Sequence, residues 1–134
     1  MQICGSCHCQ KVKFEITGPV HRFTLCHCPD CRKIGGSAFN SAMVVASDGF
    51  KLVSGEDNLS DYESSPGKFR CFCKTCGAHV YSRMNYKPEI TIVRAGLVDG
   101  DPGIRPQQHI WVSHKAPWYE IADSLPQFQE MFKA

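Results

Sequence analysis

Nine cysteines, arranged in three short clusters, are the residues of this chain best suited to chemistry. The clusters read CGSCHC from residue 4, CHCPDC from residue 26 and CFCKTC from residue 71. An odd number of cysteines cannot all form disulfides within one chain, and cysteines separated by one or two residues are typical of metal sites. Three clusters of three sulfurs do not divide into closed sites of four ligands. Either one site keeps a position open or some cysteines go unused, and an open metal position can do chemistry.

Two of the clusters can together supply four sulfurs to one ion. Cys73 and Cys76, followed by Gly77, have the spacing of a zinc knuckle, in which a tight turn points both sulfurs at one metal. Cys7 and Cys9 are two residues apart, so their side chains share one side if this segment is extended. These four sulfurs predict a closed zinc site that joins the two halves of the chain and stabilises the fold.

The middle cluster offers three sulfurs, from Cys26, Cys28 and Cys31, with no obvious fourth partner. Zinc held by three protein ligands keeps its fourth position for water or a substrate, which is the pattern of catalytic zinc sites. The alternative is that Cys4 or Cys71 supplies the fourth sulfur and closes the site.

The elements that must position these clusters are short strands. Runs of alternating apolar and polar residues, separated by turn signals such as Gly18-Pro19, predict a mostly β chain. Helix signals are weak: one turn over residues 31–35 and a helix over 123–133, with Pro126 near its first turn. Nothing resembling a linker interrupts the chain, so residues 1–134 are predicted to form a single domain. The strands are expected over residues 12–16, 23–25, 39–46, 50–53, 59–63, 69–73, 78–82, 90–95 and 109–112.

Composition argues against several classes of function. Charged residues make up 21% of the 134 residues and the formal net charge is +2, which gives no field strong enough to favour nucleic acid. Two thiolate-bound zinc ions would shift the net charge to about −1. No apolar stretch is long enough to cross a membrane, and no signal peptide precedes the first cluster. The expectation is a cytoplasmic protein without nucleic-acid or membrane partners.

Four motifs resemble, in the same order, those of the glutathione-dependent formaldehyde-activating enzyme family, also called the CENP-V/GFA domain. They are GSCHCQKVKFE from Gly5, CHCPDCRKIGGS from Cys26, RCFCKTCG from Arg70 and HIWVSHKAPW from His109. The core motifs span about residues 3–118, and the C-terminal tail, 119–134, is expected to pack on them. The resemblance implies the Mss4-like β-tent fold, in which short antiparallel sheets are braced by zinc.

The resemblance divides the cysteines as their spacing does. The family's structural zinc is held by residues that match Cys7, Cys9, Cys73 and Cys76. Its second, catalytic zinc is held by residues that match Cys26, Cys28 and Cys31. Cys4 and Cys71 fall outside the family pattern and are expected to be plain thiols.

The family reaction is the addition of glutathione to formaldehyde, giving S-(hydroxymethyl)glutathione, and its reverse, classed as a carbon–sulfur lyase reaction. Zinc ionises a coordinating thiol, and a thiolate can attack an aldehyde. Three thiolate ligands make zinc a weak Lewis acid, so the site is expected mainly to capture and position the thiol. The resemblance therefore implies two zinc ions, glutathione as co-substrate and a small thiol or aldehyde as partner.

Residues that follow the catalytic cluster are candidate contacts for glutathione. Arg32 and Lys33 can pair with its carboxylates, and Gly36 and Ser37 lie in a turn that offers backbone N–H groups. The structural alternatives are a solvated helix face for the first pair and an ordinary turn for the second.

The histidines and tryptophans are expected to be structural. His8 and His27 stand between paired cysteines and should point away from the metal in an extended segment. His109 can shuttle a proton near neutral pH, although a structural hydrogen-bonded role is the expectation. Trp111 and Trp118 are expected first to pack in the core or at its rim, and second to form the wall of a pocket.

Two other functions fit the same residues. One is a noncatalytic, zinc-stabilised binding module, and the other is a thiol-based redox or metal sensor that uses Cys4 and Cys71. The related centromere proteins carry long basic or disordered extensions. No such extension is expected here, which disfavours chromatin binding.

Overall fold

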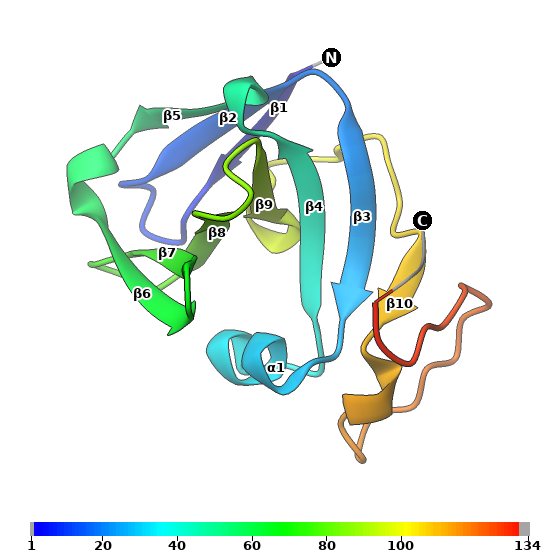
Figure 1. The fold of residues 1–134 in the computed structure, drawn as a ribbon. Coiled ribbons are helices and arrows are strands. Elements are labelled where there is room, and N and C mark those ends of the chain that lie inside the picture. The colour runs from blue at the N-terminus through cyan, green and yellow to red at the C-terminus, as the bar shows by residue number, and fades with distance from the viewer. Residues whose placement is uncertain (1, 132–134) are drawn as a thin grey trace.

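The computed structural model describes residues 2–131, and the protein is mainly β, as the sequence predicts. The described strands form a three-stranded sheet in the order β1-β2-β5 and a seven-stranded sheet in the order β10-β3-β4-β9-β8-β7-β6 (Figure 1). The strands are β1 (Gln2–Ser6), β2 (Lys13–Thr17), β3 (Val20–Cys26), β4 (Asn40–Ala46), β5 (Phe50–Ser54), β6 (Leu59–Ser65), β7 (Lys68–Cys73), β8 (His79–Met84), β9 (Ile90–Arg94) and β10 (Gln108–Ile110). The helices are α1 (Pro29–Gly35) and the 3₁₀ turns η1 (Ser47–Gly49), η2 (Glu56–Asn58), η3 (Ala95–Leu97) and η4 (Val112–His114).

The core lies between the two sheets and is built from alternate residues of their strands. Phe14 and Ile16 of β2 and Met43 and Val45 of β4 are almost completely buried there. Burying a side chain of this size stabilises the fold by about 1.5–3 kcal/mol. Because residues i and i+2 of a strand share a face, the even-numbered residues of β4 lie on the other face of the large sheet. That second face carries the site.

One strand and one pairing differ from the sequence prediction. The prediction omits β1, in which Gly5 lies so close to the Phe14 ring that an added Cβ would stand 2.1 Å from it. A glycine such as Gly5 usually indicates a turn in the sequence, whereas in β1 it permits close packing against Phe14. The pairing of β10 with β3 is parallel, while the other strand pairs described are antiparallel. The predicted strand 109–112 ends at Ile110, and Trp111 has a left-handed backbone (φ 58°) that starts η4.

The helix predicted over residues 123–133 is wrong for its described part, 123–131. This segment runs alongside β10: the Phe128 N–H donates to the His109 carbonyl at 2.9 Å, and the Val112 N–H donates to the Phe128 carbonyl at 3.0 Å. Backbone groups that pair with another segment in this way cannot form helical bonds, and Pro126 has no N–H to donate. Residues 132 and 133 lie outside the described chain.

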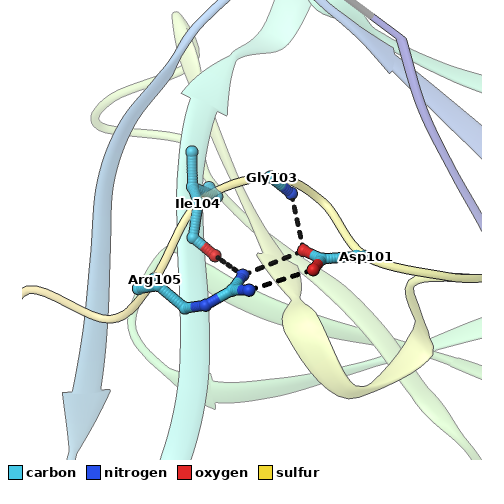
Figure 2. A network of polar contacts seen from close by, with 4 residues as sticks. All are labelled: Asp101, Gly103, Ile104 and Arg105. Carbon is cyan, nitrogen blue, oxygen red and sulfur yellow. Dashed lines mark hydrogen bonds and ion pairs between the residues drawn. The ribbon is translucent and has the colours of Figure 1, made fainter.

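The loop between η3 and β10 is held by Asp101 (Figure 2). Its carboxylate accepts two bonds of 2.9 Å from the Arg105 guanidinium and one of 2.8 Å from the Gly103 N–H. These donors hold the pKa of Asp101 below its usual range. The loop leads the chain back to β10, which lies beside β3 at the edge of the large sheet (Figure 1).

Across residues 2–131, the helices are too short or too polar to cross a lipid bilayer.

Candidate metal centres and active site

Four sulfurs converge where the two sheets meet. Cys7 and Cys9 lie in the turn between β1 and β2, and Cys73 and Cys76 lie at the turn between β7 and β8. The four Sγ atoms are within 4.8 Å of one another, with 3.6 Å between Cys7 and Cys9 and 3.7 Å between Cys9 and Cys73. Tetrahedral zinc with bonds of about 2.3 Å spaces its sulfurs by about 3.8 Å. The group has the spacing to hold one metal ion, which would link the small sheet to the large one.

A tight turn brings Cys7 and Cys9 together, and the extended segment expected from the sequence is absent there. Gln10 has a left-handed backbone (φ 71°), and its N–H donates to the Cys7 carbonyl at 3.0 Å. The Val12 N–H donates to the Cys7 sulfur at 3.3 Å. The turn therefore groups the sulfurs as predicted, for a different geometric reason.

Three further sulfurs converge where β3 meets α1. Cys26 ends β3, Cys28 is the N-cap of α1 and Cys31 lies in the helix, and their Sγ atoms are within 4.8 Å of one another. The helix begins here because the Cys28 sulfur accepts the Cys31 N–H at 3.3 Å and Pro29 occupies the first turn. Figure 1 shows α1 at the end of the large sheet, between β3 and β4.

Cys4 and Cys71 belong to neither sulfur group in the described chain. Cys71 follows Arg70 on β7, and the Arg70 side chain reaches Cys31, with 3.8 Å from Nη1 to Sγ. Neighbouring residues of a strand face opposite sides, so Cys71 points away from Cys31 and towards Tyr81. Burial raises the pKa of the Cys71 thiol, which keeps it protonated. Cys4 is exposed on β1.

Two buried donors bond to Cys31, and neither was singled out from the sequence. Asn40 donates from Nδ2 to the Cys31 sulfur at 3.6 Å, and Arg70 donates from Nη1 at 3.8 Å. Both residues are only 3% exposed. Hydrogen bonds from the neighbouring cysteines Cys26 and Cys28, with the charge of Arg70 and the Asn40 bond, hold the pKa of Cys31 below its usual range. The sequence signal was slight: Arg70 precedes the third cluster and Asn40 lies in a predicted strand.

A second guanidinium, that of Arg94, lies near these sulfurs and is hydrogen-bonded to the neutral ring of His79. Arg94 donates from Nη1 to Nδ1 of His79 at 2.8 Å, and Nε2 of His79 donates to the Tyr81 carbonyl at 3.1 Å. Burial, followed by the charge of Arg94, lowers the pKa of His79 to about 3. Burial lowers the pKa of Arg94, while the negative charges of Cys31 and Cys26 act against this shift.

The lowered pKa of His79 predicts that the folded protein loses stability measurably in mild acid. As the pH falls from the unfolded value of 6.5 towards about 3, the unfolded chain binds a proton at His79 before the folded chain does. The free energy of unfolding should therefore fall with pH by about 1.4 kcal/mol per unit more steeply than in His79→Gln, which has no proton to bind. Urea unfolding of both proteins from pH 7 to pH 5 measures the difference, and parallel curves would contradict this account.

His27 and His109 form a buried chain that ends at Asp123. Nε2 of His27 is 2.8 Å from Nδ1 of His109, and Nε2 of His109 is 2.9 Å from the Asp123 carboxylate. A carboxylate only accepts, so His109 donates to Asp123 and accepts from His27. Burial lowers the pKa of His27 to about 4. Both rings therefore support the loop that carries Cys26 and Cys28, which is the kind of structural role expected of them.

A cavity of about 310 Å³ opens onto the three-sulfur group. Its lining includes the three cysteines together with Asn40, Arg70 and Trp111. The Oδ1 atom of Asn40 is buried and has no hydrogen-bond partner among the described residues. A buried acceptor without a partner is costly, so this atom marks a place where a ligand can donate a hydrogen bond. Trp118 is 71% exposed, so the expectation that it packs in the core is wrong.

The four residues predicted to contact glutathione do not line this cavity. The N–H groups of Gly36 and Ser37 both donate to the Arg32 carbonyl and close the C-terminus of α1. Lys33 is exposed, and Arg32 is half-buried with its Nε unpaired. Contacts from these residues to a substrate remain a prediction, and the backbone N–H groups are already used by the fold.

The chain is similar over most of its length to known proteins. The sequence profile of the family described as glutathione-dependent formaldehyde-activating enzyme matches residues 2–114. A Halomonas elongata protein, provisionally named as such an enzyme, is 30% identical over 129 residues, which cover 90% of this chain and 82% of that protein. A Schizosaccharomyces pombe protein named as an uncharacterized lyase is 26% identical over 124 residues, which cover 92% of this chain and 88% of that protein.

A solved structure agrees with these matches. The crystal structure of a Rhodobacter sphaeroides protein superposes with a TM-score of 0.57 at 25% identity, covering 77% of this chain and 91% of that one. The family profile includes all three cysteine clusters, both sulfur groups and the strands that carry them. The chain therefore belongs to the glutathione-dependent formaldehyde-activating enzyme family.

Proposed function

We propose that this protein is a zinc-dependent carbon–sulfur lyase that joins a thiol to an aldehyde and splits the adduct, as in the formation of S-(hydroxymethyl)glutathione. The observation that carries the proposal is the group of Cys26, Cys28 and Cys31, which faces a cavity and has no fourth cysteine in the described chain. A site with three protein ligands beside a cavity is the arrangement of a catalytic metal. The names of the relatives support the same reaction class.

Both sulfur groups suit zinc. All-thiolate sites select soft or borderline metals, and tetrahedral sulfur sites are typical of zinc or iron–sulfur centres. The four-sulfur group of Cys7, Cys9, Cys73 and Cys76 is proposed to be structural and the three-sulfur group to be the reactive centre. All nine cysteines are free, in keeping with a reducing compartment such as the cytoplasm.

Different residues of the site would bind the thiol and interact with the hydroxyl that forms from the aldehyde. Zinc held by the three cysteines would supply an ionised thiol at neutral pH. Arg70 and Asn40 withdraw negative charge from Cys31 through their N–H···S bonds, which offsets the electron donation of three thiolates. When the S–C bond forms, the carbonyl oxygen becomes a hydroxyl by gaining the proton that the thiol loses. The unpaired Oδ1 of Asn40, a residue that lines the cavity, would accept the hydrogen bond of that hydroxyl.

Magnetisation exchange in NMR tests the reaction. Glutathione and its hydroxymethyl adduct interconvert without enzyme, so zinc-loaded protein should raise their exchange rate in proportion to its concentration. Cys4→Ser is the matched control, since this exposed cysteine lies outside both sulfur groups and its loss should leave the rate unchanged. An exchange rate no faster than that of the uncatalysed mixture, both with glutathione and with a mercaptoalkanoate in its place, would refute the proposed enzyme.

A further inference from the structure

We propose that the cavity selects a thiol with an aliphatic body and a terminal carboxylate and without an ammonium group, so that glutathione is not its preferred thiol. The proposal rests on the proposed function in one respect, because it takes the three-sulfur group to be the place where the thiol binds. Three features of the cavity carry it: the direction in which it runs, its aliphatic floor and the charges along its wall.

The strand register gives the direction of the cavity. Asn40 pairs with Cys26 at the sulfur end of β4, whereas Val44 pairs with Ile92. Ile92 pairs with Ser82, Ser82 with Arg70, and Lys68 lies two residues further from the sulfurs on β7. Lys68 is thus six residues further along the sheet than Asn40, an offset of about 20 Å in the strand direction at about 3.3 Å per residue, and it lies three strands away. A thiol bound at the sulfurs has its tail directed towards Lys68.

The floor between these two ends is mainly aliphatic, and the hydroxyl residues Thr24 and Ser82 also line the cavity. Ala42 and Val44 of β4, Ile90 and Ile92 of β9 and Met84 of β8 all line the cavity. They lie on the face of the large sheet opposite to the core, so this apolar surface is not used by the packing of the two sheets. Covering it with the methylene groups of a ligand is favoured by about 25 cal/mol per Å² of apolar surface.

The charges along the cavity have a single sign. Arg22, Lys68, Arg70 and Lys87 line it, and no aspartate or glutamate does so within residues 2–131. Lys68 is half-buried, and within the described chain neither its ammonium nor that of Lys87 has an acidic partner. A cleft with one sign of charge attracts the opposite sign, and these two ammonium groups are free to bind a carboxylate.

Glutathione is only partly complementary to the basic side chains that line the cavity. Its two carboxylates suit the basic side chains, but its γ-glutamyl ammonium would enter a cleft that offers four cations and, in the described chain, no carboxylate. A simple mercaptoalkanoate carries the thiol, the methylene chain and the carboxylate without this mismatch.

Isothermal titration calorimetry on the zinc-loaded protein tests the proposal with three thiols of equal length. Mercaptohexanoate should bind roughly ten-fold more tightly than mercaptohexanol, because one hydrogen-bonded charge is gained, and aminohexanethiol should bind most weakly of the three. Mercaptohexanoate should also bind more tightly than glutathione. Lys68→Met should bring mercaptohexanoate and mercaptohexanol to within a factor of about two of each other. Lys51→Met, on the exposed side of β5 and away from the cavity, is the matched control and should preserve the full ratio.

The outcomes separate this proposal from the reaction on which it depends. If all three thiols and glutathione bind with similar affinities, the selection for an anionic aliphatic thiol is wrong while the thiol-binding site stands. If glutathione binds most tightly of the thiols, the inference that the basic side chains of the cavity disfavour glutathione is likewise wrong. If no thiol binds to the zinc-loaded protein, the proposed function fails together with this inference. Retention of the carboxylate preference in Lys68→Met would show that another group binds the anion.

Discussion

Replacing Cys9 by serine is expected to destabilise the whole fold. Cys9 is half-buried, so the serine hydroxyl itself adds little cost, and the effect should come from the metal site. Structural zinc contributes about 10–16 kcal/mol of folding free energy in zinc-finger peptides, whereas domains are stable by only about 5–15 kcal/mol in total. Losing one of four ligands should remove about 5 kcal/mol or more and lower the melting temperature by roughly 20 °C.

Thermal unfolding followed by circular dichroism, with zinc measured in the same samples, checks this expectation. The reason for so large an effect is the position of the group: Cys7 and Cys9 belong to the small sheet, and Cys73 and Cys76 belong to the large one. Cys4→Ser serves as the control, because it replaces an exposed cysteine of the same cluster that joins no sulfur group. If the Cys9→Ser protein had the same melting temperature as the wild type, these sulfurs would not hold a structural metal.

Replacing Cys28 by serine is expected to abolish catalysis while leaving the fold intact. Cys28 is both a candidate ligand and the N-cap of α1, where its sulfur accepts the Cys31 N–H. Serine is among the best N-cap residues, so the substitution should keep the helix and remove only the metal ligand. Exchange between glutathione and its adduct should slow by more than about 100-fold, since even the loss of an outer partner of a metal ligand costs 10–100-fold.

Native mass spectrometry of the reduced protein provides the matching structural readout. Wild type should carry two zinc ions, Cys28→Ser one, and Cys71→Ser two, because Cys71 points away from the three-sulfur group. The melting temperature of Cys28→Ser should stay well above that of Cys9→Ser. Two zinc ions and full activity in Cys28→Ser, or a single zinc in the wild type, would show that the three-sulfur group is not a catalytic zinc site.

The strands were predictable because their signal is local. Alternation of apolar and polar residues follows from the period of two in a strand, and most predicted strands, such as 39–46 and 50–53, overlap those observed. The exceptions arise where tertiary contacts override local preference. Gly5 reads as a turn residue yet lies within a strand over Phe14, and residues 123–131 pair with the segment around β10 where a helix was predicted.

Grouping of the cysteines was predictable for the same reason. Cysteines two residues apart can bring their sulfurs together in a strand or in a tight turn, so Cys7 and Cys9 were grouped correctly although they lie in a turn. The partners of these sulfurs were not predictable. Asn40 and Arg70 reach Cys31 from β4 and β7, and they are 9 and 39 residues away from it in the sequence.

The sequence by itself therefore determined which cysteines of each cluster lie together and the mainly β architecture, because cysteine spacing and strand periodicity are properties of a few neighbouring residues. Tertiary structure alone decided whether a fourth cysteine reaches the second group, because the direction of Cys71 depends on which face of β7 is turned towards Cys31. It also decided what surrounds that group. The basic wall and aliphatic floor of the cavity come from five different strands, and only the register of the sheet places their side chains on one face.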